Sequence, residues 1–150
     1  MKTQNSILIA TVAALAFALA PVTQAEPTQA ELPSAYPLVV TIHSAGDVLR
    51  GETGSFVLNR VGGGPWGVHV NFKVSGTAIP GVDYAALVSP AYIGPSGYAV
   101  LSVKTLPDPR GSFNREAYSV VVTLEPGPGY SLGTPSSATI WIKPNAISNW

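Results

Sequence analysis

The chain has 150 residues, with eight basic and eight acidic side chains and no cysteine. The lack of cysteine excludes disulfides, thiol catalysis and cysteine-ligated metal sites. The few basic residues are scattered, so they form no positive stripe that could follow a phosphate backbone, and we expect no nucleic-acid partner.

The N-terminal segment has the pattern of a secretory signal peptide. An early lysine precedes an apolar run from Ile7 to Ala20, and the small residue Ala25 follows the helix-breaking Pro21. This run is shorter than the roughly 20 residues that span a bilayer. We therefore expect cleavage of residues 1–25 and an exported protein, secreted or held in the periplasm or cell envelope, with no membrane span after cleavage. A retained N-terminal anchor is the alternative.

The rest of the chain divides into a leader, one domain and a tail. Residues 26–37 carry three prolines and no apolar periodicity, which predicts an extended leader. Residues 38–145 are sufficient for one domain with a single hydrophobic core, and residues 146–150 are left as a C-terminal tail.

A hydrophobic period of two, which is the spacing of β-strands, dominates the domain. In the stretch VHVNFKVS, the apolar side chains from Val68 to Val74 fall on one face, which predicts a single strand over residues 68–75 with that face in the core. On the later stretch YSVVVTL, Ser119 is expected to point outward. The same alternation predicts strands in five further segments: residues 38–44, 54–60, 98–105, 118–124 and 138–143.

Glycine and proline clusters separate these segments, and no part of the domain shows a sustained helical period. Six or seven short strands at near-regular spacing are typical of an all-β, antiparallel two-sheet sandwich. A barrel is the alternative, whereas the lack of an internal repeat argues against a propeller or solenoid.

Several segments resemble, in order and spacing, the Calx-beta domain family. The most specific likeness pairs SGTA and GVDY, at residues 75–78 and 81–84, with the later GYSLG at residues 129–133. The resemblance extends from about Val39 to Pro144. It implies an immunoglobulin-like antiparallel β-sandwich of about seven strands, as in sodium-calcium exchangers, integrin tails and exported bacterial adhesion proteins. Some family members bind calcium at one end of the sandwich.

The resemblance also implies which acidic residues would hold calcium. They are the Asp of the Asp-Tyr step, an acid of the first loop and two acids of a later loop: Asp83, Glu52 or Asp47, Asp108 and Glu116. Arginines in the later loop, and a lysine where the terminal acidic pair would stand, oppose the converging carboxylates that calcium requires. We therefore expect no required cofactor and at most weak calcium binding. Asp83 is expected to accept hydrogen bonds from the backbone of its own turn, after Gly81.

The sequence carries no motif of a known catalytic site. It contains no H-E-x-x-H, no nucleophile elbow and no phosphate-binding loop. Asp108 and Glu116 could be read as a glycosidase pair, but their Pro-rich loop with two arginines fits surface charges better. His43 and His69 fall on predicted strands and are expected to be outward polar residues. We expect no enzymatic activity.

Tryptophan is the better indicator of function. Trp66 lies in the loop GGGPWG, and Trp141 falls on the outward face of the last predicted strand. Exposed tryptophans mark contact sites because they offer a large amphipathic surface at low entropic cost, although both could instead cover the ends of the core. The leading hypothesis is a non-catalytic exported module for structural or adhesive contact with a protein or surface polymer. The alternative is a calcium-binding sensor domain with ions at one end of the sandwich.

Overall fold

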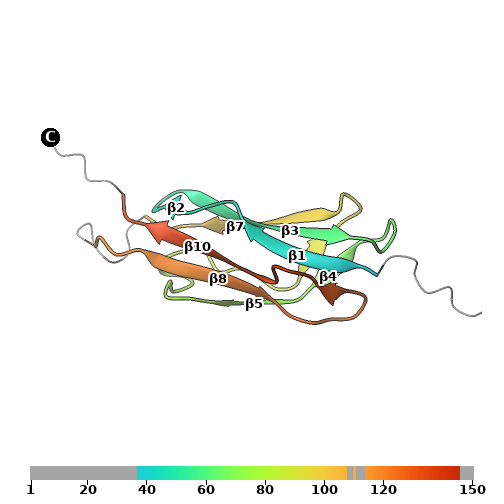
Figure 1. Ribbon diagram of the computed structural model, residues 1–150. Helices are drawn as coiled ribbons and strands as arrows, with labels where there is room; N and C mark the ends of the chain where they lie inside the picture. The colour runs from blue at the N-terminus through green and yellow to red at the C-terminus, as the bar shows by residue number, and fades with distance from the viewer. Residues whose placement is uncertain (1–36, 108–109, 111–113, 146–150) are drawn as a thin grey trace, which may run out of the picture. The chain divides into compact units, whose positions relative to one another are not determined.

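The computed structural model describes residues 37–107, 110 and 114–145, and the predicted signal peptide and tail lie outside these residues. The described chain is all-β (Figure 1). Its strands are β1 (Val39–Ser44), β2 (Val48–Leu49), β3 (Thr53–Val61), β4 (Val68–Val70), β5 (Phe72–Ser75), β6 (Ala91–Ile93), β7 (Tyr98–Lys104), β8 (Tyr118–Leu124), β9 (Ser131–Leu132) and β10 (Ser137–Lys143). No helix among the described residues is long and apolar enough to cross a membrane.

The strands form two four-stranded sheets and one two-stranded sheet. The first has the order β7-β3-β1-β9, the second has the order β2-β10-β8-β5, and β4 pairs with β6. The long pairs are antiparallel, as predicted. The short strands β9 and β2 join β1 and β10 in parallel, so each large sheet is mixed at one edge instead of wholly antiparallel.

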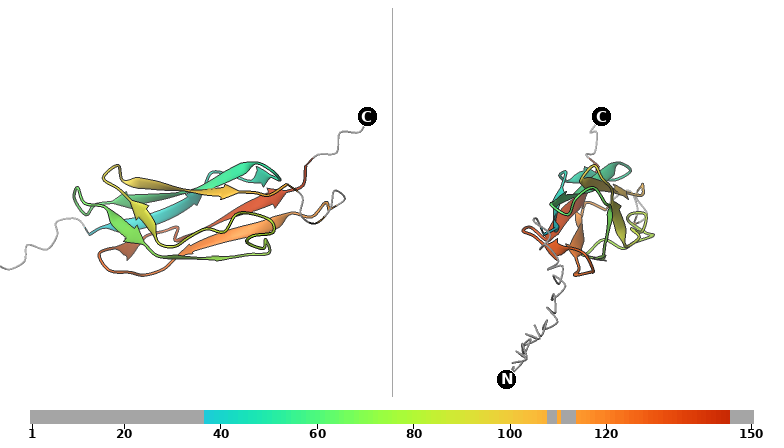
Figure 2. Two further views of the ribbon diagram at one scale, coloured as in Figure 1. Left: turned by 180° about the vertical axis from the view of Figure 1, so that it is seen from behind. Right: turned by 90° about the vertical axis from the view of Figure 1, so that its right-hand side faces the viewer.

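The two large sheets face each other across one hydrophobic core (Figure 2). Val40 and Phe56 point inward from the first sheet, Val120 and Ile140 point inward from the second, and all four are fully buried. Because successive side chains of a strand point to opposite faces, the period of two in the sequence becomes one apolar face on each sheet. The prediction of an all-β sandwich is confirmed, and the barrel considered as an alternative does not form among these strands.

The stretch predicted as one strand, residues 68–75, is broken at Asn71, and that prediction is wrong. The chain pairs with β6 before this residue and with β8 after it, so it passes from one sheet to another. The Asn71 amide donates to the Tyr130 hydroxyl at 3.0 Å, and the Asn71 carbonyl accepts from the Glu125 amide at 2.8 Å. The inward side chains keep their period across the break, which is why alternation alone could not reveal it.

The segment after β5 packs tightly on β8. Ser119 lies on the outward face of β8, yet only 7% of it is exposed. Its amide donates to Thr77 Oγ1 at 2.8 Å, and its hydroxyl accepts from the Thr77 amide at 3.1 Å. Gly76, with φ +119°, allows this approach, because a Cβ there would lie 2.2 Å from the Ser119 carbonyl oxygen. Ser119 therefore points outward, as predicted, but the segment around Thr77 covers it and shields it from solvent.

Candidate functional site

The loop after β3 presents Trp66 outside the sandwich. Arg60, near the end of β3, donates from Nη2 to the Gly64 carbonyl at 3.1 Å and from Nη1 to the Trp66 carbonyl. One guanidinium thus fixes the backbone at two points of the loop, while 77% of Trp66 stays exposed. The interpretation of Trp66 as a cover for the core is wrong.

Two more aromatic rings lie beside this loop on the two-stranded sheet. His69 of β4 and Tyr92 of β6 are cross-strand partners, and their ring centroids are 5.0 Å apart. The Tyr92 ring lies over Gly67, where a Cβ would come 2.1 Å from the Tyr92 hydroxyl oxygen. Both His69 and Tyr92 are exposed. We call Trp66, His69 and Tyr92 the aromatic patch.

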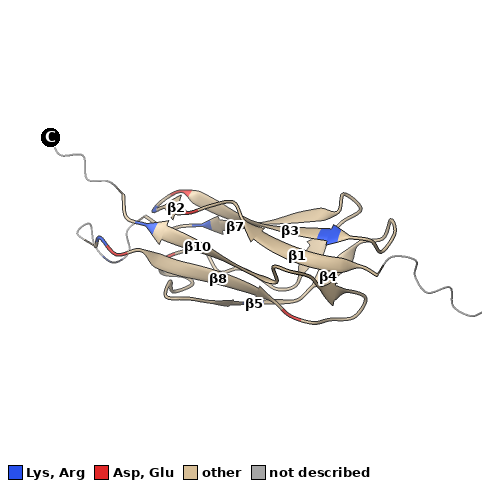
Figure 3. Cartoon of the chain, viewed as in Figure 1, with Lys and Arg blue, Asp and Glu red and all other residues tan. Residues whose placement is uncertain are grey.

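The aromatic patch offers contact surface more than reactive chemistry. Aromatic side chains bury a large area with few rotatable bonds, and for this reason they dominate the energetics of many interfaces. The charged residues of the described chain lie mainly near the ends of strands and in the loops (Figure 3). His43 and His69 both point outward from their strands, as predicted. Sequence reasoning missed Tyr92, because the three residues of β6 are too few to show a period.

Trp141 lies on a different surface, the outer face of β10. Its cross-strand partner is Ser119, and 44% of Trp141 is exposed, so it does not cover the core either. The Trp141 amide donates to Asp47 Oδ1 at 3.1 Å, and Asp47 forms an ion pair with Lys143 at 2.6 Å. The hydrogen bond from Lys143 lowers the pKa of Asp47 below its ordinary value. Trp141 lies on β10, which pairs with β2 just before the start of β3, whereas Trp66 lies beyond the end of β3. The two tryptophans therefore do not form one surface.

Asp83 is buried in the segment between β5 and β6, and both of its carboxylate oxygens accept hydrogen bonds. The Ile79 amide donates to Oδ2 at 2.7 Å, while Arg110 donates from Nε to Oδ1 at 2.9 Å and from Nη2 to Oδ2 at 2.6 Å. Burial raises the pKa of Asp83, but the bonds from Arg110 and Ile79 outweigh it and hold the pKa below its ordinary value. Asp83 accepts a backbone hydrogen bond within its own turn, as predicted. The donor is the Ile79 amide, which lies before Gly81, whereas the prediction placed the donor after Gly81.

Tyr118 connects this ion pair to β8. The guanidinium carbon of Arg110 lies 4.1 Å from the centroid of the Tyr118 ring, which is cation–π geometry. The Tyr118 hydroxyl accepts from Asn114 Nδ2 at 2.8 Å and donates to Glu116 Oε2 at 3.1 Å. We call Asp83, Arg110 and Tyr118 the polar network. The sequence indicated Arg110 only as a charge that opposes calcium, and its partnership with Asp83 could not be seen because 27 residues separate them.

The calcium candidates do not converge among the described residues. Asp83 is occupied by Arg110, Glu116 contacts the Tyr118 hydroxyl, and Glu52 is exposed. Asp108 lies outside the described residues. Within the part of the chain that the structure describes, no group of three or more histidine, aspartate or glutamate side chains could hold a metal ion.

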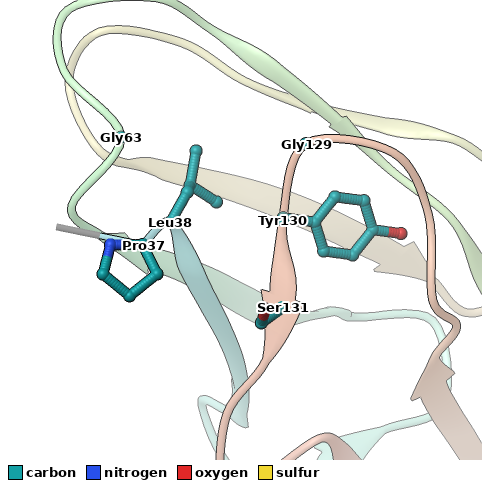
Figure 4. Close-up of a pocket in the computed structure, with 6 residues that line it drawn as sticks. All are labelled: Pro37, Leu38, Gly63, Gly129, Tyr130 and Ser131. Carbon is teal, nitrogen blue, oxygen red and sulfur yellow. The ribbon is translucent and has the colours of Figure 1, made fainter. Parts of the chain in front are cut away.

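Two pockets lie at the surface of the sandwich. One, of about 360 Å³, lies at the start of β1 and is lined by Pro37, Leu38, Gly63, Gly129, Tyr130 and Ser131 (Figure 4). The other, of about 300 Å³, lies beside β5 and is lined by Val74, Ser75, Gly76, Ala78, Pro80, Tyr84, Ala86 and Leu87. Neither lining contains a carboxylate or an imidazole, so neither offers a general base for a serine hydroxyl.

The described chain is therefore an all-β sandwich with an internally satisfied polar network and an exposed aromatic patch. A scan against protein-family models finds no match, and a search of the curated proteins finds none. The chain is similar to a solution NMR structure of the CARDB domain of PF1109 from Pyrococcus furiosus, with 16% identity, coverage of 73% of this chain and 96% of that one, and a TM-score of 0.43. A crystal structure of that domain in complex with di-metal ions has 18% identity, coverage of 74% and 90%, and a TM-score of 0.40. The fold assignment rests on the strand pairings and the shared core.

Proposed function

We propose that this protein is an exported, non-catalytic, Calx-beta-like module that binds a protein or a surface polymer, at the cell envelope or outside the cell, through the aromatic patch. The observation that carries the proposal is the 77% exposure of Trp66 on a loop that Arg60 fixes. Burying an indole removes a large apolar area from water, and that gain is unused in the free protein. A partner that covers the ring would bury this apolar area, and the free energy gained would favour binding.

The fixed loop favours binding because its backbone need not be ordered when the partner arrives. Ordering of interface loops is one of the main costs of association, and a preorganised loop reduces it. Tyr92 and His69 extend the same surface on two paired strands, so the contact area lies on a sheet as well as on a loop. Tryptophan and tyrosine are also the residues most enriched among interface hot spots.

A non-catalytic role is supported by the chemistry of the described surface. The two pockets have no general base in their linings, and both histidines are exposed on strands. No contact among the described residues favours a calcium sensor, because the carboxylate that the family resemblance points to, Asp83, accepts hydrogen bonds from Arg110 and from its own turn.

The test is retention of the exported protein on the envelope fraction of the exporting cell. Trp66→Ala should reduce retention about tenfold or more, as loss of a hot-spot residue does. Trp141→Ala is the matched control, because it removes an exposed indole from a different surface and should leave retention unchanged. Arg60→Gln keeps the indole but frees its loop, and it should give an intermediate loss. Unchanged retention of Trp66→Ala would contradict the proposal.

A further inference from the structure

The outer strands of the two large sheets are protected to different degrees. β9 and β2 have two residues each. β5 has four residues, and its first amide, that of Phe72, donates to the Ser89 hydroxyl at 3.0 Å. β7 has seven residues and contains no proline. Proteins prevent unwanted strand pairing by keeping edge strands short or covered, and β7 shows neither protection along most of its length.

The hydrogen bonds beside β7 identify the residues that face away from β3. The Lys104 carbonyl accepts from the Ala85 amide at 2.9 Å on one side, whereas the amide of the next residue, Thr105, donates to the Glu52 carbonyl on the β3 side. Because the backbone groups of successive residues point in opposite directions across a sheet, every second residue shares the orientation of Lys104. These residues are Tyr98, Val100 and Ser102.

Within the residues that the structure describes, the backbone amides of these three residues have no hydrogen-bond acceptor. The only bond to their carbonyls in that part of the chain is a long one, at 3.5 Å, from the Ser96 hydroxyl to the Tyr98 carbonyl. Tyr98 is 55% exposed and Val100 is 52% exposed. β7 therefore combines a free backbone edge with an uncharged, partly apolar side-chain row along residues 98–102.

We propose that β7 pairs with β7 of a second copy of this chain, with the two strands antiparallel across a two-fold axis at Val100. The Val100 residues of the two copies then lie opposite each other, and Tyr98 of each copy lies opposite Ser102 of the other. In this register all three edge-facing residues of each copy exchange both backbone hydrogen bonds with their opposite residues. The first sheet of each copy becomes half of one continuous sheet.

A second copy fits this edge because the edge is complementary to itself. The register places a large ring opposite a small hydroxyl and valine opposite valine, and no charged residue lies within 98–102. Removal of residues 1–25 takes away Lys2 and leaves seven basic and eight acidic side chains, so the exported chain carries a formal net charge of only −1 and long-range repulsion between two copies is weak. A two-fold contact uses the same surface on both copies and closes on itself, so it ends at a dimer. The proposal does not depend on the aromatic patch, which lies on other strands.

Cysteine cross-linking tests the register, since the chain has no native cysteine. Opposite residues of a hydrogen-bonded antiparallel pair have Cα atoms about 5.5 Å apart, which suits a disulfide. Val100→Cys in the exported protein should therefore form a cross-linked dimer as its main product under mild oxidation. Tyr98→Cys and Ser102→Cys should each stay uncross-linked, because each of these residues lies roughly 14 Å from the same residue of the second copy. A mixture of these two variants should cross-link.

Sedimentation of the wild-type protein supplies the second measurement, with a dimer as the expected result. Val100→Pro removes an amide that faces the edge and makes no hydrogen bond to β3. The variant should sediment with the mass of a monomer and keep the wild-type circular dichroism spectrum. Val57→Thr is the control, because Val57 is opposite Val100 on β3 but not at the edge, and it should remain a dimer. A wild-type protein that sediments as a monomer would overturn the proposal, even if its β7 pairs with an extended segment of another protein. Equal cross-linking at all three positions would overturn it as well.

Discussion

The polar network and the aromatic patch both depend on an arginine, but the two arginines act in opposite ways. Arg110 binds the carboxylate of Asp83, so the functional group of that side chain is used inside the fold. Arg60 binds backbone carbonyls, including that of Trp66, so the backbone is fixed while the side chain stays outside. The difference shows that an ordered side chain is available to a partner only where internal bonds hold its backbone and not its functional group.

The two regions should therefore respond differently to mutation. Changes in and around the polar network should lower the free energy of unfolding and leave binding intact. Changes in the aromatic patch should weaken binding and leave the free energy of unfolding nearly unchanged.

The largest effect is expected at Gly76, next to the polar network. Gly76→Ala places a Cβ 2.2 Å from the Ser119 carbonyl oxygen at φ +119°, so we expect a loss of about 3 kcal/mol or more in denaturant unfolding. Gly81→Ala is the control, with φ +80° and no atom within 4 Å of the added Cβ. It should cost about 1 to 2 kcal/mol. Equal losses at the two positions would mean that the packing of this segment on β8 is not important.

Asp83→Ala should lower the free energy of unfolding by about 1.5 to 3 kcal/mol, because hydrogen bonds to a buried charge are lost. Trp66→Ala, measured in the same way, should change it by about 0.5 kcal/mol or less. Arg110→Gln should act in the same direction as Asp83→Ala, and the double variant should lose less than the sum of the two single losses. Strict additivity would show that the two side chains do not interact.

Acid unfolding should reveal the carboxylate of Asp83. Its folded-state pKa lies below its unfolded value, so its stabilising contribution is complete above about pH 3.9 and is lost as the pH falls through the lower folded pKa. Melting curves from pH 7 down to pH 2 should show a smaller loss of stability below pH 4 for Asp83→Asn than for the wild type. Parallel curves for the two proteins would argue against the ion pair.

Calcium should have the smallest effect. A true ligand at one hundred times its dissociation constant would stabilise the fold by about 2.7 kcal/mol. Because Asp83 is already bound by Arg110, we expect the same melting temperature in millimolar calcium and in chelator. If calcium instead raised the melting temperature of the wild type but not that of Asp83→Ala, Asp83 would belong to an ion site.

The sequence was sufficient to predict the sandwich, because alternation such as that from Val68 to Val74 depends only on which faces are buried. It could not predict the break at Asn71, since the inward side chains keep their period while the hydrogen-bond partners change. The glycine-rich loop around Trp66 was compatible with an exposed ring or with a cover for the core, and only the structure distinguishes them. The two hydrogen bonds from Arg60 to the carbonyls of this loop could not be predicted, because they depend on the path of the loop.

The same limit applies to contacts between distant segments. Arg110 was interpreted only as a charge that opposes calcium, and its bond to Asp83 depends on two loops that meet only in the folded chain. Tyr92 gave no signal in a three-residue strand, and its place beside His69 and Gly67 follows from the pairing of β4 with β6.

The most direct test of the central claim compares Trp66→Ala with Asp83→Ala on the envelope fraction, at a temperature where both variants remain folded. We predict that Trp66→Ala binds about tenfold more weakly or worse while keeping the wild-type melting temperature. Asp83→Ala should bind as the wild type does, although it melts at a lower temperature. Wild-type binding by Trp66→Ala together with loss of binding by Asp83→Ala would contradict the division between the two regions.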